Sequence, residues 1–273
     1  QLSTRAQKPL PLLGLFTSYV HRGLIKGFIA SGDAQEAAYH EVVGEALDGV
    51  GWEAILEEAA AAGMLHPLGN GLYELHPTLP TFLRAQLVEA VGEAGFARLD
   101  LEFMRFYAGF AAYFFEGVRN GQRDAVMAIF IEEPNLLRGL RSAGERTQWN
   151  AAQVIIQTLD ELYKVQNRLG EESSLRRTVL GRIGSEPPSP TADRDQANLW
   201  MYLMGQEADQ ALQHNDLTAA EHAYHSILEY LISLNDPEAA PNIAVGYHQL
   251  GIIARERQQF DQAEAWYRQA LEI

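Results

Sequence analysis

The sequence predicts a mainly α-helical fold that contains one small β-hairpin. Apolar residues recur three or four positions apart through most of the 273 residues, which is the periodicity of helices with one buried face. The exception is the segment 64–76, in which two short apolar runs flank a Gly-Asn-Gly sequence typical of a tight hairpin turn. Hydrophobic residues make up 47% of the chain and charged residues 21%, so the chain has enough apolar surface to fold.

Within residues 1–90, helices are predicted to precede this hairpin. Gly63, which tolerates a left-handed backbone, is expected to end the helix that leads into it. Helices followed directly by a hairpin are the order of elements in a winged helix, so we interpret 1–90 as a winged-helix domain. Helical patterns are expected at 10–20, 23–30, 34–47 and 51–64.

The rest of the chain is predicted to consist of paired helices. The prolines of 184–193 cannot continue a helix, so 184–195 is expected to be a linker. It separates a degenerate helical-repeat region, 91–183, from a more regular one, 196–273. The expected pairs are 97–119 with 122–143, 150–168 with 171–183, 196–213 with 216–234, and 241–257 with 260–273.

The last two pairs carry the spacing of tetratricopeptide repeats. Gly251 and Ala263 are small where two helices would cross closely, and larger residues would fill the space between the helices. Ala220 and Ala263 are 43 residues apart, longer than the usual repeat of about 34. We therefore expect 196–273 to form an α-solenoid, with further repeats following in the natural protein. The positions of the pattern are Met204, Ala208, Ala211, Leu217, Ala220, Tyr224 and Ile227, then Tyr247, Leu250, Gly251, Ala254, Phe260, Ala263, Tyr267 and Ala270.

Such repeats present a groove to a protein or peptide ligand. The repeat pattern assigns the groove to one face of the first helix in each of the last two pairs. The other interpretation of the same residues is that they form ordinary solvated helix faces. The predicted groove residues are Tyr202, Gln206, Asp209, Gln213, Val245, His248, Ile252 and Arg255.

The charge of the chain argues against nucleic acid and anionic membranes as partners. The net charge is −15, and no lysine or arginine occurs between Gly27 and Leu83. A peptide-responsive transcription regulator, the alternative function for a winged helix with repeats, would need a basic recognition surface there. The acidic residues in this interval are Asp33, Glu36, Glu41, Glu45, Asp48, Glu53, Glu57, Glu58 and Glu74.

Sequence motifs for enzymatic chemistry are lacking. The three lysines, Lys8, Lys26 and Lys164, all lie outside a phosphate-binding loop. The chain has no cysteine, which excludes thiol nucleophiles and thiolate metal sites and fits a cytoplasmic location. No apolar run is long enough for a membrane-spanning helix. We therefore expect a non-catalytic protein without a cofactor of its own in this chain.

Two groups of polar residues invite a chemical role. His222, His225 and Glu229 share a helix face and could be read as metal ligands, but the repeat pattern predicts that they point to solvent. Glu132 and Glu133 precede Pro134, and we interpret them as an acidic helix start that complements the positive end of the helix dipole.

The order of winged helix, helical pairs and repeats resembles the C-terminal half of bacterial STAND-class signalling ATPases, which are relatives of plant resistance proteins and apoptotic protease-activating factors. The segment "GMLHPLGNGLYELHPTLPTFLRAQL" (63–87) is similar to the end of their winged helix. The segment "FIEEPNLLRGLRSA" (130–143) is similar to their first helical repeat, where Glu133, Asn135 and Leu136 match.

The resemblance implies a role for His76 in nucleotide sensing. In that family a winged-helix histidine touches the β-phosphate of bound ADP, and His76 matches its position, although Pro77 replaces the aspartate of the plant proteins. ATP or ADP would then bind an upstream nucleotide-binding domain in a longer protein that includes this chain. The alternative for His76 is a structural residue bonded to backbone at the junction of the hairpin and the next helix. The alternative for the whole protein is a repeat scaffold without an ATPase domain.

Overall fold

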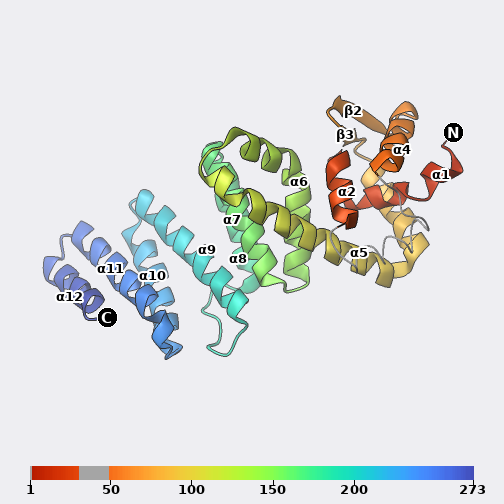
Figure 1. Ribbon diagram of the computed structural model, residues 1–273. Helices are drawn as coiled ribbons and strands as arrows, with labels where there is room; N and C mark the ends of the chain where they lie inside the picture. Colours follow the sequence, from red (N-terminus) through yellow and green to blue (C-terminus); the bar gives the residue numbers. More distant parts are fainter. Residues whose placement is uncertain (1, 31–48) are drawn as a thin grey trace. The chain divides into compact units, whose positions relative to one another are not determined.

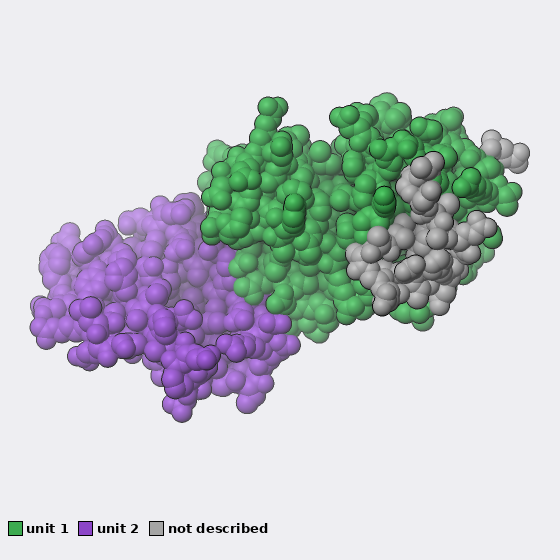
Figure 2. All heavy atoms as spheres, in the orientation of Figure 1, with its two compact units in different colours: residues 1–172 green, residues 173–273 purple. Residues whose placement is uncertain are grey.

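The structure, a computed structural model, describes residues 2–30 and 49–273, and the helix expected at 34–47 lies outside the described residues. The chain divides into two compact units, Gln1–Glu172 and Ser173–Ile273 (Figure 2). The described residues are mainly helical and contain one small three-stranded sheet, which confirms the predicted fold class at this level. The domain boundaries at 90 and at 184–195 stay predictions.

Unit 1 combines a small sheet with short helices and a layer of longer helices (Figure 1). The three strands are antiparallel in the order β1-β3-β2, so the central strand comes last in the chain. The elements are α1 (Thr4–Gln7), the 3-10 helix η1 (Leu10–Leu15), β1 (Tyr19–His21), α2 (Arg22–Ala30), α4 (Gly49–Ala61), β2 (Leu65–Gly69), β3 (Leu72–Leu75), α5 (Leu79–Arg119), α6 (Arg123–Glu145), α7 (Trp149–Val165) and the start of α8 (Leu169–Ile183).

The predicted hairpin and the predicted helix stop before it are both present. Asn70 and Gly71 have φ of +53° and +79°, the left-handed backbone of a two-residue hairpin loop. Gly63 has φ of +76°, and the Met64 N–H donates to the Ala59 carbonyl at 3.0 Å, which closes the end of α4. The local sequence therefore determines how the chain passes from α4 into the sheet.

The helical pattern predicted at 10–20 is wrong over its second half. Only Leu10–Leu15 is helical, and Tyr19–His21 forms the edge strand β1. In the sheet, Tyr19 is opposite Glu74 and Val20 is opposite Tyr73. The pairing partner is more than fifty residues away in the sequence, so local periodicity carries no information about it.

The long helices of unit 1 follow a sharp kink at Gly92, whose φ of +70° and ψ of 170° interrupt α5. The part of α5 after the kink packs against α6 and α7, as Figure 1 shows. A Cβ at Gly139 of α6 would lie 3.4 Å from both Tyr107 of α5 and Ile155 of α7, so the three helices meet closely at this glycine. The helices expected at 97–119 and 122–143 correspond to this part of α5 and to α6.

Unit 2 contains the remainder of α8 and consecutive helices that each pack against the next. Gly251 contacts the Tyr267 ring so closely that a Cβ there would lie 2.5 Å from it, which confirms the expected close crossing. Phe260 was expected to pack in the interior, but it is 66% exposed. It is the first residue of α12, and the first buried residue of this helix is Ala263, three positions later. The elements are α9 (Arg194–Gln213), α10 (Leu217–Ser233), the 3-10 helix η2 (Pro237–Ala239), α11 (Ala240–Glu256) and α12 (Phe260–Leu271).

The buried core of unit 2 includes five positions of the repeat pattern, Met204, Ala208, Ala220, Tyr224 and Leu250, together with six residues outside the pattern. Helix α10 starts at a capped turn, in which the Asp216 carboxylate accepts a hydrogen bond from the Ala219 N–H at 3.0 Å. The buried cluster comprises Ala197, Trp200, Met204, Ala208, Ala220, Ala223, Tyr224, Leu228, Tyr230, Leu250 and Ile253.

Candidate functional site

The predicted groove residues lie on α9 and α11 of unit 2. All eight are at least partly exposed: Asp209, Gln213, Val245, His248 and Arg255 are exposed, and the other three are half-buried. We call these eight residues the α9–α11 surface. Every one of them therefore has a side-chain portion that a ligand could reach.

On α9, two residues of this surface are already held by internal hydrogen bonds. The Gln206 side-chain oxygen accepts from Arg176 at 3.0 Å, and the Asp209 carboxylate accepts from the Tyr224 hydroxyl at 2.5 Å. Burial, and then the Asp209 carboxylate, raise the pKa of Tyr224, so its proton stays in this hydrogen bond at neutral pH. These bonds fix the orientation of the two side chains before any ligand arrives.

On α11, the surface combines apolar and polar side chains. Val245 is an apolar residue with 56% of its surface exposed. The His248 ring lies 5.6 Å from the Tyr267 ring, and Arg255 donates to Glu256 at 2.8 Å. Val245 is thus the exposed apolar contact of this surface. His248 lies one turn further along α11, and Arg255 lies about 15 Å further along the helix axis.

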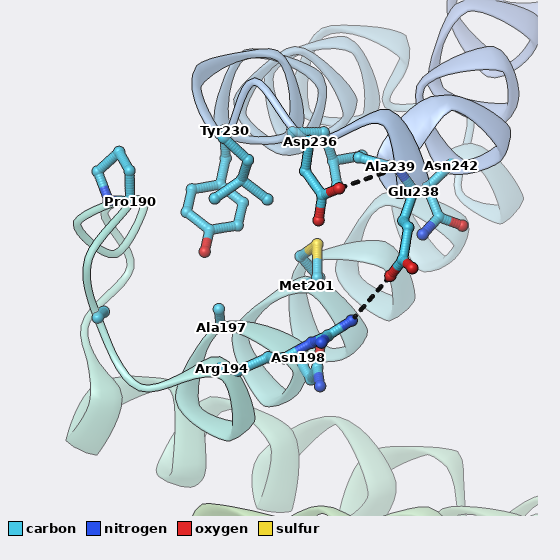
Figure 3. Close-up of a pocket in the computed structure, with 13 residues that line it drawn as sticks. Pro190, Arg194, Ala197, Asn198, Met201, Tyr230, Asp236, Glu238, Ala239 and Asn242 are labelled. Carbon is cyan, nitrogen blue, oxygen red and sulfur yellow. Dashed lines mark hydrogen bonds and ion pairs between the residues drawn. The ribbon is translucent and has the colours of Figure 1, made fainter.

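A recess with a volume of about 340 Å³ lies beside the first turns of α9 and α11 (Figure 3). Asn198 from α9 and Asn242 from α11 both line it, so both helices border the same depression. In Figure 3, Met201 and Tyr230 point toward its centre. Arg194 and Glu238 form a 3.9 Å ion pair across its mouth, and both side chains are mostly exposed. The recess therefore offers an apolar floor with amide and charged groups at its edge.

The histidines of α10 do not form a metal site. His225 packs edge-on against the Trp266 ring at 5.7 Å, and Trp266 in turn stacks on Tyr247. The expectation that His225 points to solvent is therefore wrong: an aromatic side chain of α12 partly covers it. His222 and Glu229 are exposed as expected. No cluster of three or more metal-ligating side chains occurs within residues 2–30 and 49–273.

His76 lies at the junction of β3 and α5. Its ring is exposed, its Nδ1 lies 2.9 Å from the Thr78 hydroxyl, and the Thr78 N–H approaches the same nitrogen at 3.5 Å. The His76 carbonyl accepts from the Leu79 N–H at 2.8 Å. These contacts match the interpretation of a residue bonded at the strand–helix junction, and the role in nucleotide sensing stays a prediction.

The interpretation of Glu132 and Glu133 as a helix start is wrong. The helix α6 runs without a break from Arg123 to Glu145, and Pro134 lies inside it. Both carboxylates are instead used in tertiary contacts. Glu133 accepts two hydrogen bonds from Arg168, at 2.7 and 2.9 Å, and one from the Tyr163 hydroxyl at 2.8 Å.

Glu132 belongs to a buried polar cluster that the sequence did not reveal. It is 2% exposed, and its Oε2 accepts from the Tyr107 hydroxyl and from Asn135, both at 2.7 Å. Asn135 also accepts from the Thr17 N–H at 2.9 Å and donates to the Tyr19 carbonyl at 3.1 Å. The cluster therefore holds β1 against α5 and α6. A polar residue on the apolar face of a helix was the only signal available in the sequence.

Comparison of the chain with family models, with curated proteins and with solved structures finds no match. None of the described helices is both long enough and apolar enough to span a lipid bilayer.

Proposed function

We propose that this protein is a non-catalytic regulatory or sensor module that binds a peptide or protein segment on the α9–α11 surface. The observation that carries the proposal is the exposure of all eight predicted residues, with exposed Val245 on α11 and a recess beside the two helices. Protein-binding sites usually combine apolar contacts with polar groups, and the α9–α11 surface has both.

The hydrogen bonds within the surface support a role in recognition. Gln206 and Asp209 are held by Arg176 and Tyr224, so little side-chain entropy would be lost when a ligand contacts them. Asn198 and Asn242 at the recess carry amides, each of which can donate to and accept from a peptide backbone. An extended segment could thus be bound through its main chain here and through an apolar side chain at Val245.

We further propose that the chain combines a winged helix with tetratricopeptide-like repeats and acts within a STAND-type signalling protein. The order of short helices, hairpin and helical pairs supports this assignment, as does the junction position of His76. Occupancy of the α9–α11 surface would bias an equilibrium between inhibited and active states of the longer protein. The absence of cysteine suits action in a reducing compartment such as the cytoplasm.

Peptide selection on the full 273-residue chain tests the binding proposal. Peptides selected from a random library would be measured by calorimetry against the wild type, Val245→Arg and Gln269→Arg. Gln269 is exposed on α12, so this control adds the same charge away from the surface. We expect Val245→Arg to weaken binding roughly tenfold or more. Equal affinities for the two variants, or failure to select any peptide, would contradict the proposal.

A further inference from the structure

The recess beside the first turns of α9 and α11 contains a hydroxyl group that the fold leaves without a hydrogen bond. Tyr230 of α10 is 5% exposed, and its ring packs edge-on against the buried Trp200 ring, with the ring centres 5.6 Å apart. Within the described residues, the Tyr230 hydroxyl has no hydrogen-bond partner. The hydroxyl keeps surface that is accessible to solvent, and Figure 3 shows it pointing into the recess. It is therefore a polar group in a fixed position that a ligand can reach.

The charged side chains of the recess leave one carboxylate without a cation. Arg194, Asp236 and Glu238 line the recess, and Arg194 pairs with Glu238 at 3.9 Å. Asp236 accepts a hydrogen bond from the Glu238 N–H at 2.9 Å, but no basic side chain of the described residues forms an ion pair with it. In Figure 3 the Asp236 side chain points toward Met201, into the recess. The recess thus has one negative charge in excess.

Apolar side chains supply much of the remaining lining. Met201 comes from α9, and Leu231 and Leu234 come from the end of α10. The volume of about 340 Å³ is at the small end of the range for ligand sites, roughly 300–1,000 Å³. The face of the Tyr230 ring can also attract a cation. These features suit a short hydrocarbon chain that ends in a positively charged group with several hydrogen-bond donors.

We propose that this recess binds the side chain of an arginine residue, whose guanidinium donates to the Tyr230 hydroxyl oxygen and to the Asp236 carboxylate. Its methylene groups would pack against Met201. An apolar side chain would cover both acceptors without donating to either, and Asp236 would repel a carboxylate. A guanidinium has five N–H donors in one plane, so a single side chain can reach acceptors on two elements. That the arginine belongs to a peptide on the α9–α11 surface rests on the proposed function.

Both acceptors are held in place before a ligand arrives. Burial raises the pKa of Tyr230, so its hydroxyl is neutral at neutral pH and the attracting charge is that of Asp236. Trp200, which holds the Tyr230 ring, donates from its Nε1 to the Ser185 carbonyl at 3.3 Å. The bond from the Glu238 N–H likewise orients the Asp236 carboxylate. Little side-chain entropy would therefore be lost on binding.

A titration without any peptide tests the recess itself. The full chain, with ¹³C in its methionine methyl groups, would be titrated with N-acetylarginine methylamide and with N-acetylcitrulline methylamide, in which a neutral urea group replaces the guanidinium. The Met201 methyl resonance, assigned with Met201→Leu, reports binding in the recess, and Met127 of α6 is the internal control. We expect the arginine compound to shift the Met201 resonance with a Kd about fivefold lower than that of the citrulline compound.

Two variants test the two proposed contacts. Tyr230→Phe removes only the hydroxyl, and Asp236→Asn removes the charge but keeps an oxygen that can accept from the Glu238 N–H. Each should raise the Kd of the arginine compound roughly threefold or more. The matched control is Asp216→Asn, which changes an exposed capping aspartate at the other end of the 17-residue α10 and should have no effect. Circular dichroism and thermal unfolding verify that each variant folds.

The peptides selected against the full chain separate this inference from the proposed function. We expect them to contain an arginine whose replacement by citrulline weakens binding about tenfold. Peptides that depend on Val245 but tolerate citrulline would overturn the arginine assignment and leave the proposed function intact. The assignment is also overturned if the arginine compound does not shift the Met201 resonance, or if folded Tyr230→Phe and Asp236→Asn bind it as the wild type does. Binding of the arginine compound without any selected peptide would contradict the proposed function alone.

Discussion

Asp100 joins three segments of unit 1 that are far apart in the sequence. Its carboxylate accepts from Arg138 at 2.7 Å, from the Ser142 hydroxyl at 2.6 Å and from Arg146 at 3.3 Å. Arg138 also donates to the carbonyls of Gly14 and Leu15, and it lies over the Phe103 ring. A single carboxylate on α5 therefore holds the guanidinium that fixes η1 against α5 and α6.

Asp100→Asn should destabilise unit 1 by about 2–3 kcal/mol. The Asp100 and Arg138 side chains are only 13% and 10% exposed, so the variant leaves a largely buried cation without its anion. Urea unfolding followed by circular dichroism measures the change. The control is Glu116→Gln, whose pair with Arg119 is exposed and should contribute less than about 1 kcal/mol. A loss no larger than that of the control would show that Arg138 is held by its carbonyl contacts alone.

The stability contribution of Asp100 should disappear at acidic pH. Burial raises the pKa of Asp100, but the hydrogen bond from Ser142 and the charge of Arg138 outweigh burial, and the pKa lies below its usual value. The folded state therefore binds fewer protons than the unfolded state, in which the pKa is about 3.9. The difference in unfolding free energy between wild type and Asp100→Asn should be constant above pH ~5 and shrink as the pH falls through the folded-state pKa. A difference that is unchanged at pH 3 would contradict this assignment.

At the scale of elements, the helical hairpins were the most predictable part of the chain. Their apolar periodicity and turn residues are local, so the expected ends of α9, α10, α11 and α12 agree with the structure to within a few residues. Strand β1 was not predictable, because its identity depends on pairing with β3. The expected helix 122–143 spans Pro134 and corresponds to α6, but the interpretation of Glu132 and Glu133 as a helix start was wrong, because both lie inside this helix.

Among the candidate site residues, some features also followed from local sequence, and others depended on contacts between distant elements. The exposure of the α9–α11 surface followed from helical phase, which is a local property. The role of Glu132 depends on Tyr107, 25 residues earlier in the chain. His225 likewise acquires its ring contact from α12. The roles of Glu132 and His225 depend on contacts with other helices. The spacing of residues within one helix does not predict such contacts.

The crossing of α11 and α12 at Gly251 provides a test at the same scale. Gly251→Ala would push a methyl group into the Tyr267 ring and should cost about 1–2 kcal/mol. Gly205→Ala is the matched control, since a Cβ there meets nothing within 4 Å in the interior of α9, and it should be neutral or stabilising by about 0.5–1 kcal/mol. Thermal unfolding measures both. Equal stability of the two variants would mean that the helices are not packed as closely as described.

At the scale of the whole molecule, the two compact units differ in what they offer a ligand. Unit 1 holds the buried polar cluster around Glu132, and unit 2 holds the α9–α11 surface with its adjacent recess. The net charge of −15 favours neutral or basic ligands at this surface. The affinity of a basic peptide for unit 2 should therefore fall as ionic strength rises.

Site-specific photo-crosslinking tests the central claim, that unit 2 binds peptides on the α9–α11 surface, most directly. The full chain would carry a photoreactive phenylalanine analogue at position 245 or, in a second protein, at position 269, and would be irradiated with a selected peptide. We expect covalent adducts from position 245 on α11 and none above background from position 269 on α12. Adducts of equal yield from both positions, or adducts from position 269 alone, would contradict the account.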